Sequence, residues 1–250
     1  MTGGQPLHRD RARATSFGSA AARYDRFRPR YPGALIADLV PRPGIRVLDV
    51  GAGTGIATAQ LRAAGADVLA VEPDPAMAEV AAGKGLPVEV ATFAEWDPRG
   101  RSFDLVVFAQ SFHWVDPQPA LRKVGAVLAG DGRLALLWNR IVADRPSPDE
   151  LAAVYADVGA EPQRPSVLVE GDDLEPLLAA AGFTSQRRHY TEHPHYGGTA
   201  WVQMVSTYSA VLQLPAADQD LLRNRLAATI GEAGVQATND ALAVLCTITR

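Results

Sequence analysis

The sequence has little of several features that mark other classes of protein. Cys246 is the one cysteine among 250 residues, so no disulfide can form within the chain, which fits a reducing compartment. The chain has no run of about 18 apolar residues, the length that a membrane-spanning helix needs. Its first residues, MTGGQPLHRDRARATSFG, lack the apolar centre of a secretory signal. We therefore expect a cytoplasmic protein that does not enter a membrane.

An excess of basic charge is also missing. The chain carries 24 Lys and Arg against 28 Asp and Glu, which gives a net charge of −4 at pH 7. Affinity for DNA or RNA depends largely on cations that neutralise phosphates, so this balance argues against a nucleic-acid partner. Apolar residues make up 47 % of the chain, an ordinary proportion for a globular protein with a packed core.

The first half of the chain shows an alternation of strand-like and helix-like patterns. Apolar runs that predict strands fall at 45–50, 66–72, 86–92, 103–110 and 132–139. Helical patterns at 56–64, 75–84 and 117–128 separate them. Strand, helix and strand at this spacing predict βαβ units, and hence a parallel sheet with helices on both faces. We expect an α/β fold of the Rossmann-like, doubly wound type.

The alternation breaks after residue 139. Two stretches, at about 140–170 and 197–237, contain mostly proline-rich and helical segments. We expect them to form a helical cap over the working edge of the sheet rather than a separate domain. Residues 1–15 are polar and rich in arginine, which predicts a flexible arm. The remaining residues, 16–250, are expected to form a single domain.

A glycine-rich turn follows the first predicted strand. The stretch LDVGAGTG places glycines at Gly51, Gly53 and Gly55, just before a predicted helix. Glycines let a ligand approach the backbone, and the helix N-terminus offers free N–H groups. The dinucleotide fingerprint is G-x-G-x-x-G. Ile56 stands where its third glycine would fall, which counts against a nicotinamide cofactor.

Two carboxylates near this turn narrow the choice of ligand. Glu72 ends the second predicted strand, 21 positions after Gly51, which is the spacing of an acid that accepts ribose hydroxyls. Asp49 precedes the turn and would repel a pyrophosphate, whereas it suits a ligand with an ammonium group. A ribose together with an ammonium and no phosphate describes S-adenosylmethionine.

Four motifs, in order, carry a resemblance to a known family. VLDVGAGTG, VEPDPAM, FAEWDP and FDLVVFAQSFHWVD resemble the successive motifs of class I S-adenosylmethionine-dependent methyltransferases. The resemblance covers residues 16–139. FGSAAARYDRFRPRYP is similar to the N-terminal segment of small-molecule members, including the trans-aconitate methyltransferase-like group. The family implies a mostly parallel sheet of seven strands with the last one antiparallel, and ALAVLCTIT (241–249) is placed to be that strand.

The resemblance also implies roles for individual residues. In the glycine turn it assigns cofactor contacts to Asp49, Gly51, Ala52, Gly53 and Gly55, with Gly55 opening the helix. Beyond the turn, it implies that Glu72 binds the ribose and that Pro73 and Met77 border the adenine. It implies that Ala94 and Glu95 recognise the edge of the adenine and that Gln110 contacts the methyl end of the cofactor. Tyr24 and Arg28 would close the site from above.

The reaction that the family catalyses needs a base only when the nucleophile must lose a proton. His113, in the stretch QSFHWVD, is the candidate catalytic residue. A lining role and a purely structural role in the turn remain open for it. Arg28 and Arg140 could bind the carboxylate of an acid substrate. His189, His193 and His195 lack a nearby Cys or Asp partner, so we expect no metal site.

Three hypotheses for function follow. The first is methyl transfer from S-adenosylmethionine to an oxygen or nitrogen of a small molecule, mainly through proximity and in-line orientation. The second is a non-catalytic, adenosyl-cofactor-binding regulatory protein on the same fold. The third is an NAD-dependent oxidoreductase, which Ile56 disfavours. The sequence does not predict an oligomeric state.

Overall fold

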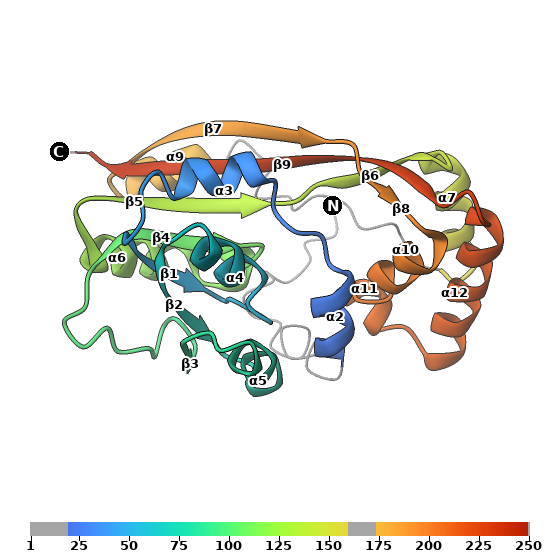
Figure 1. Cartoon of the computed structure of the whole chain (residues 1–250), viewed down its shortest axis with the longest axis horizontal. Helices are drawn as coiled ribbons and strands as arrows, with labels where there is room; N and C mark the ends of the chain where they lie inside the picture. The colour runs from blue at the N-terminus through green and yellow to red at the C-terminus, as the bar shows by residue number, and fades with distance from the viewer. Residues whose placement is uncertain (1–19, 160–173, 250) are drawn as a thin grey trace.

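A computed structural model describes residues 20–159 and 174–249 (Figure 1). The predicted flexible arm (1–15) and the last part of the first predicted cap insertion (160–170) lie outside these residues. The strands are β1 (Arg46–Val50), β2 (Asp67–Glu72), β3 (Val88–Val90), β4 (Phe103–Ala109), β5 (Leu128–Trp138), β6 (Ile141–Arg145), β7 (Phe183–Glu192), β8 (His195–Tyr196) and β9 (Val235–Ile248). The helices are α2 (Ala21–Phe27), α3 (Gly33–Leu39), α4 (Ile56–Ala63), α5 (Pro75–Gly83), the 3-10 helix η3 (Phe112–Trp114), α6 (Pro117–Val127), α7 (Pro148–Ala156), α9 (Leu174–Ala180), α10 (Gly198–Val205), α11 (Ser209–Leu212) and α12 (Ala216–Ile230).

The central sheet has the predicted doubly wound topology. Its strands follow the order β3-β2-β1-β4-β5-β9-β6, with β7 and β8 also paired to β9. The pairs formed by β1 with β2 and with β4, by β2 with β3 and by β4 with β5 are parallel. The last strand, β9, runs antiparallel to both β5 and β7. The α/β fold and the antiparallel last strand are therefore confirmed.

The sheet has nine strands rather than the predicted seven. The two additional strands, β6 and β8, both pair with the first part of β9, which begins at Val235 and not at residue 241. Buried and more exposed residues alternate over the start of β9, as in a half-buried strand. The pattern escaped prediction because Thr238 and Asn239 are polar, although Asn239 is buried.

Two apolar clusters cover the two faces of the sheet. One packs α3 and α4 against residues such as Val47, Leu137 and Ala243. The other packs α6 and α9 against the opposite face, around Phe108 and Leu136. Strands β1 and β4 are buried on both faces, which is the reason for their continuous apolar sequence.

A third cluster lies in the cap. It joins α7, α10 and α12 to the start of β9 through side chains that include Trp201, Met204 and Leu226. Figure 1 shows these helices, with α11, at the end of the molecule toward which the arrow of β5 points, and α2 lies between them and α5. The cap therefore stands at the carboxyl edge of the parallel strands, where ligands bind in open α/β sheets.

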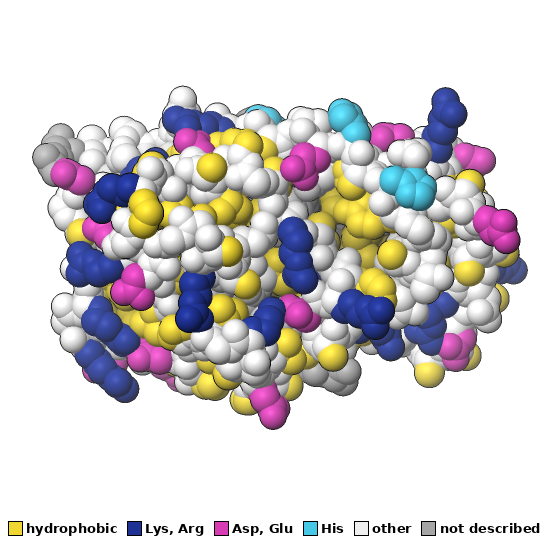
Figure 2. All heavy atoms as spheres, viewed as in Figure 1, with side chains coloured by type: hydrophobic (Ala, Val, Ile, Leu, Met, Phe, Trp, Pro, Cys, Tyr) yellow, Lys and Arg dark blue, Asp and Glu magenta, His cyan; other side chains and the backbone are white. Residues whose placement is uncertain are grey.

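The face shown in Figure 2 carries acidic and basic side chains interspersed with apolar ones. No helix among residues 20–159 and 174–249 is long and apolar enough to cross a membrane.

Candidate functional site

The glycine turn lies directly after β1 and adopts backbone conformations that favour glycine. Gly51 and Gly53 have φ angles of +66° and +59°. A Cβ at Gly51 would lie 2.7 Å from the Cβ of Ser111, so a side chain there would push the turn away from the loop that follows β4. A Cβ at Gly53 would meet nothing within 4 Å. The turn is thus tightly packed on one side and open at Gly53.

Glu72, at the end of β2, is held against this open position. Its Oε2 accepts a hydrogen bond from the backbone N–H of Gly53 at 2.7 Å, and its Oε1 accepts one from the N–H of Asp74 at 2.8 Å. Asp74 in turn caps α5 by accepting hydrogen bonds from the N–H groups of Ala76 and Met77. Burial raises the pKa of Glu72 to about 7, against the opposing effect of the two backbone N–H groups. Each carboxylate oxygen keeps a second lone pair for a ligand hydroxyl.

Asp49 is fully buried below the same turn. Its Oδ2 accepts a hydrogen bond from Oγ1 of Thr58 at 2.6 Å, whereas its Oδ1 has no hydrogen-bond partner among the described residues. Burial raises the pKa of this carboxyl to about 6. The hydroxyls of Tyr31 and Thr54 are also buried and have no hydrogen-bond partner among residues 20–159 and 174–249. Buried polar groups are normally paired, so these three atoms are candidates for hydrogen bonds to a polar ligand.

The loop after β4 meets the glycine turn from the other side. Oγ of Ser111 donates a hydrogen bond to the carbonyl oxygen of Val50, at the end of β1. Gln110 has a φ angle of +60°, and its Nε2 donates to the carbonyl oxygen of Asn139 at 3.0 Å. His113 and Trp114 follow in η3, both partly buried, with ring centroids 4.8 Å apart. Gln110 therefore precedes the residue that bonds to the end of β1, and its contact with the methyl end of the cofactor stays a prediction.

The residues predicted to surround the adenine lie around the ends of β2 and β3. Met77 is buried in α5, while Pro73 beside Glu72 is exposed. Ala94 and Glu95 are exposed in the loop after β3. Oε2 of Glu95 accepts a hydrogen bond from Oγ1 of Thr92 at 2.7 Å, which fixes the carboxylate locally. These roles remain predictions.

The two residues predicted to close the site lie in and just after α2. The guanidinium of Arg28 is sandwiched between the rings of Tyr24 and Tyr208, at 4.6 Å and 4.4 Å from their centroids. Its Nε donates to Oγ1 of Thr207 at 2.7 Å and its Nη2 to the carbonyl oxygen of the same residue at 3.0 Å. Arg28 therefore ties α2 to the cap.

The other arginine considered for an acid substrate is also engaged. Nη2 of Arg140 pairs with Oδ2 of Asp240, whose Oδ1 lies 2.9 Å from Nδ1 of His189. His193 and His195 bond to Oγ1 of Thr238 and to the carbonyl oxygen of Ala233. No group of three potential metal ligands occurs in the part of the chain that the structure describes.

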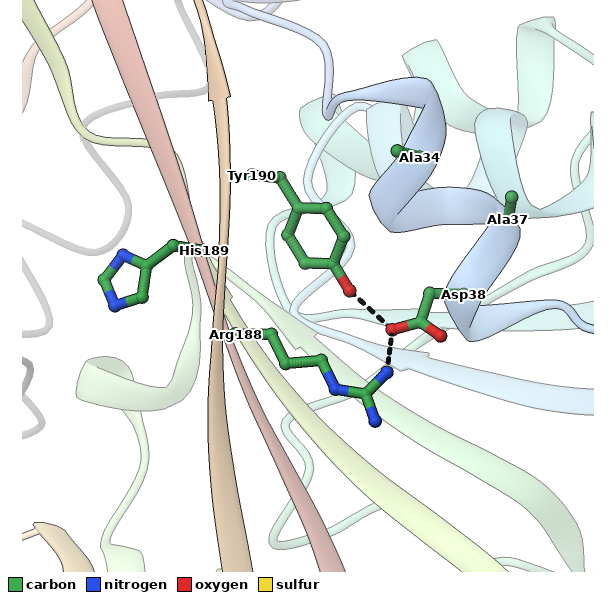
Figure 3. A pocket seen from close by; sticks show the side chains of 6 residues that line it. All are labelled: Ala34, Ala37, Asp38, Arg188, His189 and Tyr190. Carbon is green, nitrogen blue, oxygen red and sulfur yellow. Dashed lines mark hydrogen bonds and ion pairs between the residues drawn. The ribbon is translucent and has the colours of Figure 1, made fainter.

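An open hollow of about 750 Å³ lies away from the glycine turn, between α3 and β7 (Figure 3). Its lining residues are Ala34, Ala37, Asp38, Arg188, His189 and Tyr190. Tyr190 and Arg188 both donate to Oδ2 of Asp38, while His189 points to the other side of β7 in the figure. These polar groups satisfy one another, so the hollow shows no sign of a missing ligand.

Sequence reasoning missed four residues of the site region: Tyr31, Thr54, Asn139 and Asn239. Thr54 lies inside the glycine turn, and Asn139 directly follows a strand. The location of both residues at the carboxyl edge of the sheet could therefore have been predicted. Tyr31 and Asn239 carry no local signal, because their burial depends on packing between distant segments.

Comparisons with known proteins agree on one family. The model of a methyltransferase domain matches residues 24–187. An uncharacterized methyltransferase of Mycobacterium tuberculosis is 37 % identical over 206 residues, which cover 80 % of this chain and 79 % of that protein. An O-methyltransferase of Penicillium expansum is 36 % identical over 156 residues, covering 58 % of this chain and 54 % of that one. The structure of a candidate type II methyltransferase from Anaeromyxobacter dehalogenans shares the fold, with a TM-score of 0.62, 23 % identity, and coverage of 89 % of this chain and 98 % of that one.

Proposed function

Because this chain belongs to the class I S-adenosylmethionine-dependent methyltransferases, we propose that it methylates an oxygen or nitrogen of a small molecule, with the adenosyl cofactor bound across the tips of β1 and β2. The observation that carries the proposal is the pair of carboxylates around the open glycine position. Glu72 is fixed by two backbone N–H groups, and Asp49 keeps one buried oxygen without a partner.

The residues present fit this cofactor. Glu72 would accept hydrogen bonds from the ribose hydroxyls, using the lone pairs that Gly53 and Asp74 leave free. Asp49 and the hydroxyl of Tyr31 would face the ammonium of the methionyl part, which supplies the donors that the free Oδ1 lacks. Gly51, Ala52 and Gly55 would shape the turn, with Met77 and Pro73 beside the base. A pyrophosphate would instead be repelled by Asp49, which disfavours the dinucleotide alternative.

When bound, the cofactor supplies a methyl group activated by its positive sulfonium. The protein then needs chiefly to hold the acceptor atom in line with that methyl group and to exclude water. Gln110 and the η3 loop would form one wall of the site at the carboxyl edge, while Arg28, stacked on Tyr24, ties α2 to the cap. His113 would take the proton of a hydroxyl or amine acceptor. The helices of the cap lie at this end of the sheet (Figure 1), where they would help to enclose a small-molecule pocket.

An oxygen acceptor is supported by the Penicillium relative, which is named an O-methyltransferase and is 36 % identical over 156 residues. The non-catalytic alternative is not favoured, because the matching family model and the Mycobacterium relative are both described as methyltransferases.

The test is transfer of radiolabelled methyl from S-adenosylmethionine into a library of small hydroxyl and amine compounds. We expect turnover of at least one class. In the same assay, His113→Ala should lower turnover by at least about tenfold if the imidazole acts as a base, since a positioned base contributes about 10²–10⁴. An unchanged rate would leave His113 with a lining role. Binding of S-adenosylhomocysteine with no transfer into any compound would support the regulatory alternative.

A further inference from the structure

Asn239 has a buried amide oxygen without a hydrogen-bond partner among the described residues. It lies in β9 opposite Ile141 of β6, where the sheet passes from the core into the cap. The residue is 2 % exposed, and its Nδ2 donates to Oδ1 of Asn139 at 3.1 Å. Its Oδ1 accepts no hydrogen bond from residues 20–159 or 174–249. A buried acceptor without a partner destabilises the folded chain, so it needs an explanation.

The direction of this oxygen is fixed by its neighbours. An amide can in principle be turned over, which exchanges its oxygen and nitrogen. Here Nδ2 of Asn139 donates to the carbonyl oxygen of Arg30 at 3.4 Å, and a carbonyl can only accept. The Oδ1 of Asn139 therefore faces Asn239 and accepts a hydrogen bond from the Nδ2 of Asn239. The free Oδ1 of Asn239 is consequently on the side away from Asn139.

The position of Asn239 connects it to the proposed active site. Nε2 of Gln110, after β4, donates to the carbonyl oxygen of Asn139, after β5. Because β4 and β5 are adjacent and parallel, these residues stand side by side at the carboxyl edge of the sheet. Strand β4 also pairs with β1, which leads into the glycine turn. The row of three amides thus runs from the cofactor-binding turn toward the cap.

We propose that Asn239 is a recognition group for the methyl acceptor and selects a molecule with a neutral hydroxyl or amide donor over a carboxylate. The inference rests on the proposed function and names the substrate class of the same site. An amide oxygen binds only O–H or N–H groups, whereas an ionised carboxylate brings lone pairs alone. The arginines that could have bound an acid are committed elsewhere, Arg28 to Thr207 and Arg140 to Asp240.

The expected consequence is a large difference in affinity between compounds that carry a neutral donor and otherwise similar carboxylates. A site built to hydrogen-bond a polar group of its substrate discriminates sharply against analogues that leave it unpaired. An O–H or N–H group of the methyl acceptor would bind the unpaired oxygen of Asn239. An ionised carboxylate has no such group and would leave this oxygen unpaired.

The experiment uses the full chain saturated with S-adenosylhomocysteine. Benzamide, benzyl alcohol and benzoate are matched probes that differ only in their polar group, and ligand-observed NMR measures their dissociation constants. For the wild-type protein we expect the two neutral probes to bind at least about tenfold more tightly than benzoate. Benzoate binding as tightly as the neutral probes, or no binding of either neutral probe up to about 10 mM, would overturn the proposal.

Three variants assign the effect to the oxygen. Asn239→Leu should weaken the neutral probes to the level of benzoate. Asn239→Asp keeps an oxygen acceptor but loses the N–H group that donates to Oδ1 of Asn139, and its charge should strengthen the bias against benzoate. Thr238→Val is the matched control, because the Thr238 hydroxyl bonds to Asp144 rather than to the amide row, and it should change nothing. A preference that survives in Asn239→Leu contradicts the inference.

Failure of this inference and failure of the proposed function are separable. Saturation with S-adenosylhomocysteine is measured first, by its own calorimetric titration. If that titration shows no binding, the cofactor assignment is wrong. If it shows binding and only the probe preference is absent, the methyltransferase proposal stands and the role of Asn239 falls.

Discussion

At the scale of single residues, the proposed site is marked by polar atoms that are already buried in the protein without a ligand. Asp49 and Glu72 lie below and beside the glycine turn, and burial raises the pKa of both carboxyls, to about 6 and about 7. Both groups therefore bind more protons in the folded chain than in the unfolded one. By linkage, their contribution to stability is fully present below about pH 4 and is lost as the pH rises through these values.

This burial predicts a pH dependence for cofactor binding. Ionised Glu72 accepts hydroxyl hydrogen bonds better than its protonated form, so binding of the ribose favours loss of a proton. With a pKa of about 7 in the free protein, the dissociation constant of S-adenosylhomocysteine should fall by about tenfold between pH 6 and pH 8. Calorimetry in two buffers with different ionisation enthalpies should detect release of the proton. A dissociation constant that is flat over this range contradicts the assigned role of Glu72.

At the scale of secondary-structure elements, α2 connects the sheet to the cap. Lys84, directly after α5, pairs with Asp25 of α2 on one side. On the other side Arg28, stacked between two tyrosine rings, bonds to Thr207 in the cap. The helix is thus held from both sides over the carboxyl edge.

Removal of the Arg28 contacts should loosen this connection. Arg28→Ala loses two hydrogen bonds and two ring stacks, and we expect the free energy of unfolding to fall by roughly 2–4 kcal/mol. Affinity for S-adenosylhomocysteine should fall as well, because α2 no longer covers the site. Arg28→Lys keeps the charge without the planar fork and should recover only part of the loss. Arg26→Ala, on an exposed side chain of the same helix, is the control. Both alanine variants are compared by denaturant titration. Equal effects of the two would argue against a connection of α2 to the cap through Arg28.

The elements also show what sequence patterns can predict. The strand before Gly51, the turn itself and Glu72 were predictable because a continuous apolar run, the glycine spacing and one acid all occur within residues 45–72. Strands β6 and β8 were missed because they form by pairing with the start of β9, which no local pattern indicates. The partners of Arg28 and Asn139 lie 179 and 100 positions away, so their hydrogen bonds depend on the tertiary fold and not on any local pattern.

At the scale of the whole molecule, a methyltransferase sheet and a helical cap share one strand. The second half of β9 completes the core sheet, whereas its first half packs with the cap helices. The carboxyl edge of the sheet lies between these two parts, with the glycine turn on one side and the amide row leading to the other. We therefore propose that the cofactor binds to the core and that the acceptor is recognised at the junction with the cap.

The most direct measurement is a calorimetric titration of S-adenosylhomocysteine into the wild-type chain and into Glu72→Ala at pH 8. We predict one site in the wild-type protein and an affinity weaker by at least about tenfold in Glu72→Ala, since hydrogen bonds to a charged group contribute about 1.5–3 kcal/mol each. Glu79→Ala, an exposed glutamate on α5, should bind as the wild type does. Circular dichroism checks that each variant is folded. The account is contradicted if folded wild-type protein gives no binding heat, or if Glu72→Ala binds as tightly as the wild type.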